Sequence, residues 1–429
     1  MSHSFHTLAG LAATICLALQ SAPSTAQSAP AAASAAPAAS TPAIRTEVAT
    51  PLQAARAALS AGKPAEALVK LAEAEAVPSL VPYEQYLIER FRVPAAAGSG
   101  QAALAIKALD FSLASPFAQA GDALPLTQLL GTLLYQTKDY KRASATIRKY
   151  IELGGTDQPL RNLLGQALYL ADDNAGAAKV LEAQWQADRA AARAPAELTL
   201  RMLASASIKV SDDAGYLRAL EGLAQHYPRP EYWTELSVRV LRGPGFSDRL
   251  LVEVLRFQRA AGVLAGADAH LDLAQIGLNT GFPLEAQKVL AEGYAAGLLG
   301  KGPDADKHGK LRDQANRATA ADKAGATEGE NLAKVAREGD SLVNLGYLLA
   351  LDGQLERGLS LAELGLARSS LRRPEEARLR LGIVQWMAGK RDAALQTFAS
   401  VKGAEGAAEL ARLWQVFVRS PASQGRKAG

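Results

Sequence analysis

The chain has 429 residues, of which 48% are hydrophobic, 21% charged and only 6% aromatic. This length allows a large core or two to three ordinary domains, and near-average glycine and proline exclude collagen-like and wholly disordered chains. Abundant alanine and leucine disfavour an all-β fold and favour helices. The net charge of +4 is spread along the chain, so we expect no nucleic-acid partner, which would need a concentrated basic face.

The first 26 residues have the pattern of an export signal. Residues 8–19 form an apolar stretch that is long enough for a signal peptide but too short to span a bilayer. His3 and His6 precede this stretch without any Lys or Arg, and Cys16, the single cysteine, lies inside it. We therefore predict a signal peptide over residues 1–26 and a periplasmic protein; the alternative is a short buried helix in a cytoplasmic protein.

A segment dominated by Ala, Pro and Ser follows over residues 27–50. Small side chains and proline cannot bury enough apolar surface to fold, so we predict a disordered tether there. Beyond the tether we expect no transmembrane segment, since no apolar run reaches about 18 residues.

From residue 51 onward, apolar residues recur with helical spacing in runs broken by Gly, Pro or Asp. Small residues recur in pairs 12 positions apart, which lets two antiparallel helices cross closely. The pairs are Gly131 with Ala143, Gly165 with Ala177, Ala274 with Ala286, Gly346 with Gly358 and Gly382 with Ala394. A larger apolar residue often follows four positions later, and units repeat every 34 or 36 residues.

These spacings resemble those of tetratricopeptide repeats, for example where Leu381 and Gly382 precede Gly389, Ala394 and Phe398. The resemblance implies an all-α fold, an α-solenoid of antiparallel helix pairs over residues 51–420. Residues 195–265 and 301–335 fit poorly and are expected to be atypical units. Residues 406–420 predict an amphipathic capping helix, followed by a disordered tail over 421–429. We expect the capping helix to bury Leu410, Leu413, Trp414 and Phe417.

The order of features also resembles an exported proteobacterial family of tetratricopeptide-like proteins. The landmarks are residues 83–86 (YEQY), 227–233 (YPRPEYW) and 401–403 (VKG). Some members of that family are associated with TonB-type energy transduction, so the resemblance implies TonB-system components as possible partners.

Catalytic chemistry finds no support in the residue pattern. His226, His270 and His308 are isolated, and acidic pairs such as Asp172 with Asp173 sit where helices begin. We therefore expect no enzyme, no metal and no cofactor. The alternative is an envelope enzyme, or a targeting module for one, that acts on cell-surface polymers.

In a tetratricopeptide-type solenoid, the first helix of each pair lines a concave groove. The resemblance places polar and aromatic side chains there, which could bind a peptide or protein partner while giving apolar contact. The expected groove residues are Gln128, Thr132, Tyr135, Gln136, Asn162, Gln166, Tyr169, Gln275, Asn279, Tyr347 and Trp386. The sequence thus predicts a non-catalytic periplasmic interaction scaffold; the alternative is that these are ordinary solvated helix positions.

Overall fold

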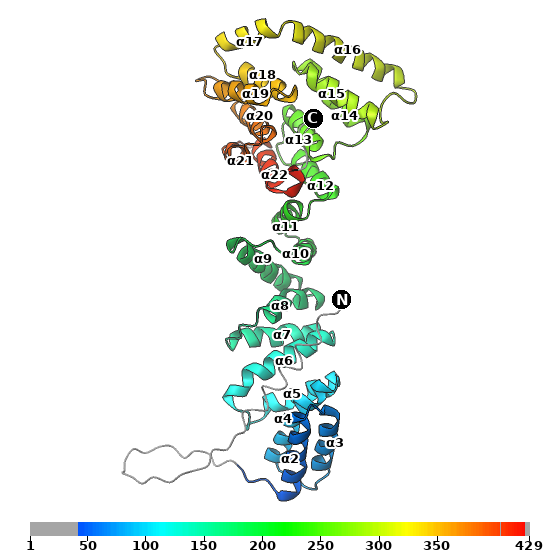
Figure 1. The fold of residues 1–429 in the computed structure, drawn as a ribbon, viewed down its shortest axis with the longest axis vertical. Helices are drawn as coiled ribbons and strands as arrows, with labels where there is room; N and C mark the ends of the chain where they lie inside the picture. The colour runs from blue at the N-terminus through cyan, green and yellow to red at the C-terminus, as the bar shows by residue number, and fades with distance from the viewer. Residues whose placement is uncertain (1–41, 404, 425–429) are drawn as a thin grey trace, which may run out of the picture. The chain divides into compact units, whose positions relative to one another are not determined.

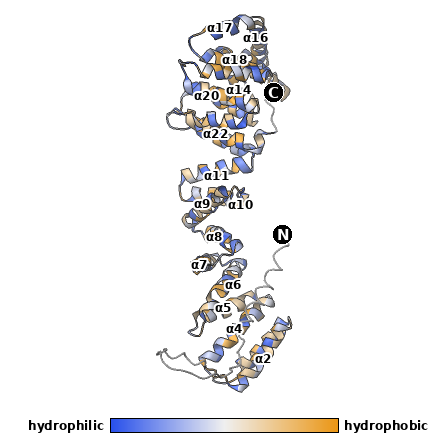
Figure 2. Ribbon diagram, turned by 60° about the vertical axis from the view of Figure 1, so that its left-hand side comes forward, coloured by the Kyte–Doolittle hydropathy of each residue, from blue (hydrophilic) through white to orange (hydrophobic). Residues whose placement is uncertain are grey.

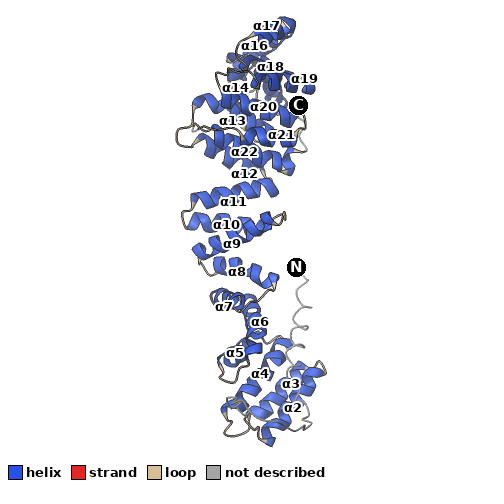
Figure 3. Ribbon diagram, turned by 90° about the vertical axis from the view of Figure 1, so that its left-hand side faces the viewer, coloured by secondary structure: helices blue, strands red, loops and turns tan. Residues whose placement is uncertain are grey.

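The computed structural model describes residues 42–403 and 405–424, and the predicted signal peptide lies outside these ranges. Within them the chain forms α-helices and short 3-10 turns with no strand (Figure 3). Consecutive helices pack as antiparallel pairs, which confirms the expected α-solenoid of tetratricopeptide-like hairpins. Across this described part, no helix combines the length and apolar character that a membrane span needs.

The chain divides into two compact units, at residues 187 and 188. The first unit stacks four hairpins in chain order, each packing on the next (Figure 1). Its helices are α2 (Thr46–Ser60), α3 (Pro64–Glu75), α4 (Pro82–Gly98), α5 (Ala102–Ala114), α6 (Ala123–Gln136), α7 (Tyr140–Glu152), α8 (Gln158–Leu170) and α9 (Asn174–Ala190), the last of which crosses the division.

The second unit contains the remaining helices. They are α10 (Glu197–Lys209), α11 (Asp213–His226), α12 (Pro230–Leu241), α13 (Leu251–Ala261), α14 (Gly266–Asn279), α15 (Pro283–Ala295), α16 (Ala305–Ala324), α17 (Ala326–Val335), α18 (Asp340–Leu351), α19 (Leu355–Leu366), α20 (Pro374–Met387), α21 (Arg391–Ala399) and α22 (Ala407–Arg419). Figure 2 shows orange apolar residues mixed with blue polar ones along these helices, as expected for amphipathic elements.

Small residues let the helices of a hairpin meet where the sequence predicted. A methyl group added at Gly346 would lie 2.5 Å from the Gly358 carbonyl oxygen, its predicted partner 12 positions on. At Gly382 it would lie 2.5 Å from the Phe398 ring, and at Gly165 2.6 Å from Leu181. At Gly165 and Gly382 the larger residue that follows the pair therefore fills the space left by the glycine, whereas at Gly346 the backbone of the partner helix does.

The C-terminal helix α22 closes the second unit. It packs on its neighbour α21 and also on α11, α12, α13 and α20. The predicted apolar face is confirmed, because Leu410, Leu413, Trp414 and Phe417 are all buried. The Trp414 ring contacts Phe257 of α13 at a centroid distance of 5.3 Å. Helix α22 thus joins the two ends of this unit instead of covering one end of an open spiral.

Helices α16 and α17 interrupt the regular stacking. Helix α16 has 20 residues and packs on α14 and α15, whereas α17 has 10 residues and packs mainly on α18. Helix α15 contacts α18 directly. Residues 301–335 therefore form an atypical pair added to the side of the solenoid.

Two predicted boundaries and one segment predicted to be atypical need correction. The tether was expected to reach residue 50, but α2 begins at Thr46, and its Val48 is fully buried against the first hairpin. The tail was expected to begin at 421, but a 3-10 turn over Pro421–Ser423 buries Ser423, whose hydroxyl donates to the Val418 carbonyl. Helices α10 and α11, inside the segment expected to be atypical, form an ordinary hairpin.

Candidate functional site

Seven of the predicted groove residues lie on two helices of the first unit. Helices α6 and α8 each open a hairpin, and they contact one another. We call this set the α6–α8 polar face: Gln128, Thr132, Tyr135, Gln136, Asn162, Gln166 and Tyr169. Gln136 and Asn162 are exposed and the other five are partly buried.

One hydrogen bond shows that the two helices place these residues side by side. The Tyr135 hydroxyl donates to Gln166 Oε1 at 2.9 Å, across 31 positions of sequence. Tyr135 and Tyr169 are 34 residues apart, as are Thr132 and Gln166, so the same face repeats from one hairpin to the next. The hydrogen bond thus joins one residue of this face on α6 to one on α8.

Neighbouring groups hold several of these side chains in place. The Tyr135 ring packs edge-on against Tyr140 at 5.5 Å, and partial burial raises the pKa of the Tyr135 hydroxyl, which therefore stays protonated as a donor. Asn162 Oδ1 accepts a 2.7 Å hydrogen bond from Gln158. Amide and hydroxyl groups beside aromatic rings can bind a peptide backbone and also give apolar contact.

The predicted groove residues of the second unit do not form a matching face. Gln275 and Asn279 are exposed on α14, where the Gln275 amide donates to Asn279 Oδ1 at 3.1 Å. Trp386 was expected to line the groove, but its ring packs on Trp414 and Phe417 of α22 at 5.6 and 5.5 Å. Helix α22 occupies the place that a partner would need beside Trp386.

Tyr347 was also expected in the groove and is instead buried in a cluster of charges. Its hydroxyl donates to Glu285 of α15 at 2.5 Å, and only 3% of the residue is exposed. Arg256 of α13 binds the same carboxylate through two nitrogens, with a shortest distance of 2.6 Å. The prediction failed because side chains of α15 and α13 contact Tyr347 on the face of α18 that was expected to line the groove.

The charges of this cluster stabilise one another. Burial opposes ionisation of Glu285, but the Arg256 charge and its hydrogen bonds prevail and lower the pKa of this carboxyl. Glu253 bridges Arg256 and Arg380 of α20, at 2.9 and 3.0 Å. Sequence reasoning missed this cluster, since its members come from four helices with no common spacing. In the described ranges, no group of three His, Cys, Asp or Glu side chains is arranged to hold a metal ion.

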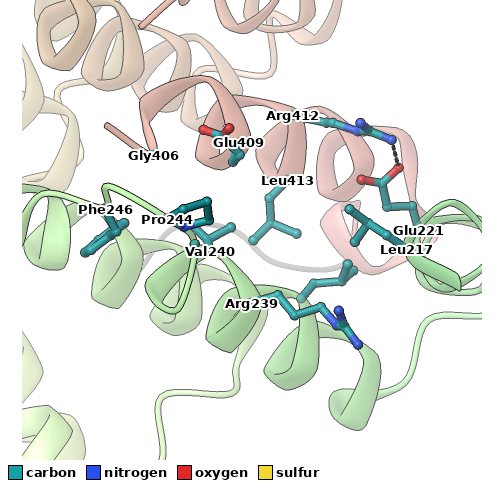
Figure 4. A pocket seen from close by; sticks show the side chains of 12 residues that line it. Leu217, Glu221, Arg239, Val240, Pro244, Phe246, Gly406, Glu409, Arg412 and Leu413 are labelled. Atoms are coloured by element: carbon teal, nitrogen blue, oxygen red, sulfur yellow. Dashed lines mark hydrogen bonds and ion pairs between the residues drawn. The ribbon is translucent and has the colours of Figure 1, made fainter. Parts of the chain in front are cut away.

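A small cavity lies where α22 meets α11 and α12 (Figure 4). Its volume is about 160 Å³, and its walls are mainly apolar, including Leu217, Val240 and Leu413. Arg412 and Glu221 form a 2.6 Å ion pair at its edge. Ligand pockets usually have about 300–1,000 Å³, so we assign this cavity no ligand.

Comparison with known proteins adds little to this geometry. No family model matches the chain, and no curated protein matches its sequence. Among solved structures, the complex of Naa15 and Naa10 bound to HypK-THB is similar over 89% of this chain and 73% of the other, with 11% identity and a TM-score of 0.22. At that TM-score nothing about the function of this chain follows from the similarity.

Proposed function

We propose that this protein is a non-catalytic interaction scaffold that binds a peptide or protein on the α6–α8 polar face. The observation that carries the proposal is the Tyr135–Gln166 hydrogen bond, because it joins equivalent surfaces of successive hairpins into one face. Extended peptides and helices both suit such a face, which offers donors and acceptors at a regular interval. The second unit offers no equivalent, since α22 covers the Trp386 side.

We also propose that the scaffold works in the periplasm as an accessory of an envelope transport system, possible partners being TonB-type components. The apolar stretch at residues 8–19 and the Ala/Pro/Ser segment after it support export, and the family resemblance of the landmarks supports the TonB association. N-terminal sequencing of the protein from a periplasmic extract tests export. A chain that begins at Met1 in the cytosol would contradict it.

A photo-crosslinking experiment in the envelope tests the binding face. A photoreactive residue at exposed Gln136 should capture a partner, whereas the same residue at exposed Lys149 on α7 should not. The double variant Tyr135→Ala/Tyr169→Ala should reduce the Gln136 crosslink about tenfold. Tyr135→Phe, which keeps the ring and removes the hydrogen bond to Gln166, should reduce it less and leave the fold intact. Equal crosslinking in wild type and double variant would overturn the assignment of this face.

A further inference from the structure

The second unit contains a large groove beside the α16–α17 insertion. Its volume is about 880 Å³, and it lies between the end of α16, helix α17, helix α18 and the start of α15. We call it the α17–α18 groove. Helix α18 contributes Leu345, Leu348 and Leu349 to it, all partly buried, and they share one face of the helix. The opposite side of α18 is already packed on α19 and α20.

Helix α17 and its start line the other side of the groove with several small residues and with Leu332, which is 61% exposed. Gly325, Ala326, Gly329 and Ala333 line the groove at helical spacing. A methyl group added at Gly329 would meet nothing within 4 Å, and neither Gly325 nor Gly329 has a positive φ. Glycine inside a helix costs about 1 kcal/mol relative to alanine. Neither packing nor backbone conformation of the described chain therefore requires Gly329.

A polar group lines the same groove without a partner. Thr319 of α16 is only 3% exposed, and its Oγ1 makes no hydrogen bond in the structure. Buried hydroxyls are normally hydrogen-bonded, and leaving one unpaired is unfavourable. The groove therefore contains a buried polar atom that no described residue satisfies.

The rim of the groove carries charge that limits what can bind. Lys323 and Asp352, which both line the groove, pair with one another at 3.4 Å. Asp322 also lines the groove and makes no ion pair within the described residues. Its local environment therefore favours a cation at the α16 end.

We propose that the α17–α18 groove binds one amphipathic α-helix of a partner protein, with a leucine-type apolar stripe and a basic residue next to Asp322. The length of the groove supports a helix, because α18 has 12 residues and so spans roughly 18 Å at 1.5 Å per residue. The small residues of α17 let the incoming backbone come close, while Leu332 and the three leucines of α18 contact its apolar stripe. This site is separate from the α6–α8 polar face and does not depend on it.

A large side chain introduced into the wall of the groove tests the proposal directly. Gly329→Leu adds a bulky side chain to the α17 wall where there is open space, so the free protein should keep its fold. Gly309→Leu is the matched control, because Gly309 lies in α16, has open space around its Cβ and does not line the groove. The probe is a synthetic leucine–lysine amphipathic helix of about 12–14 residues, and the comparison peptides are a scrambled version and a leucine–glutamate version.

Titration of the full-length chain with the labelled probe, followed by fluorescence anisotropy, decides the question. We expect saturable binding by wild type and Gly309→Leu, at least about tenfold weaker binding by Gly329→Leu, and weaker binding of both comparison peptides. Equal affinity of Gly329→Leu and wild type would overturn the proposal, as would no binding by wild type. Concentration-dependent dimerisation that Gly329→Leu abolishes would also overturn it, since a second copy would then be the occupant.

Discussion

The glycines of this chain have different functions, and the contacts around each one show which. Gly346 faces the backbone of Gly358 across the α18–α19 hairpin, and Gly382 faces the ring of Phe398 across α20–α21. Gly329 faces open space. Position in the sequence pattern predicted the first two, because each is followed by a small residue 12 positions on. It did not predict the third, and no contact within the described chain requires glycine there.

We predict that Gly346→Ala destabilises the second unit more than Gly382→Ala does. At Gly382 the new methyl group meets the buried Phe398 ring, whereas at Gly346 it meets the backbone of α19, which can shift less than a side chain. We expect about 1–2 kcal/mol for Gly382→Ala and about 3 kcal/mol or more for Gly346→Ala, the upper end of overpacking costs. Urea unfolding followed by tryptophan fluorescence measures both, and equal losses would contradict the backbone argument.

The buried charge cluster leads to a second prediction for single residues. Glu285→Ala removes one of the two carboxylates that pair with Arg256, whose side chain is only 2% exposed, and leaves Glu253 as the buried partner of both Arg256 and Arg380. We expect a loss of about 3–5 kcal/mol in the free energy of unfolding. Glu292→Ala on the same helix is the control, because the Glu292 side chain of its pair with Arg259 is 46% exposed, so we expect a smaller loss than for Glu285→Ala. A small effect of Glu285→Ala in the same urea titration would show that the cluster is not held as the structure has it.

At the scale of the helices, one carboxylate on α4 holds the start of the first hairpin in place. Glu84 near the start of α4 accepts hydrogen bonds from the Arg45 guanidinium, at 2.6 Å, and from the Val81 and Arg45 amides, each at 3.1 Å. The hydrogen bond from the Arg45 side chain is the main reason that the pKa of Glu84 falls to about 2. This carboxylate both caps α4 and ties the start of α2 to it.

Glu84 should therefore make the stability of this hairpin depend on pH. Because its pKa is lower in the folded state, the stabilisation is complete above the unfolded value of about 4.3 and disappears as the pH falls to about 2. The melting temperatures of wild type and Glu84→Gln should differ at pH 6 and converge towards pH 2, as circular dichroism would measure. Glu66→Gln, in an exposed pair with Lys63, should show no such gap. A constant gap across this range would contradict the capping role.

The elements also show what the sequence could and could not predict. Hairpins in which two small residues lie 12 positions apart were predicted correctly, because these residues lie where the two helices of the hairpin contact one another. The α10–α11 hairpin was missed because the residue of α10 that approaches Gly215 of α11 is Ser207, only eight positions away. The apolar face of α22 was predicted, but its docking on α11 and α13 was not, since local spacing carries no information about helices so far apart in sequence. Tyr347 was misplaced for the same reason.

At the scale of the whole molecule, the division into two units has an energetic meaning. In a stacked array each hairpin is stabilised mainly by its neighbours, and this holds for the first unit. The second unit is different, because α22 links α11–α13 to α20 and α21 through one core. Damage to that core should therefore spread through the second unit and stop before the first.

The variant Trp414→Ala tests whether damage to the core of the second unit stays within that unit. Trp414 packs on Phe257, Phe398 and Phe417, with centroid distances of 5.3, 5.6 and 5.8 Å, so its loss should cost about 3–5 kcal/mol. Hydrogen exchange measured by mass spectrometry should then show faster exchange in α11–α13 and in α20–α22, with residues 42–173 unchanged. Ile147→Ala, which empties the contact with Gly131 in the first unit, should give the reverse pattern. Faster exchange in both units for either variant would show that the two units unfold as one cooperative body. The packing of α22 would then not be what confines the damage to the second unit.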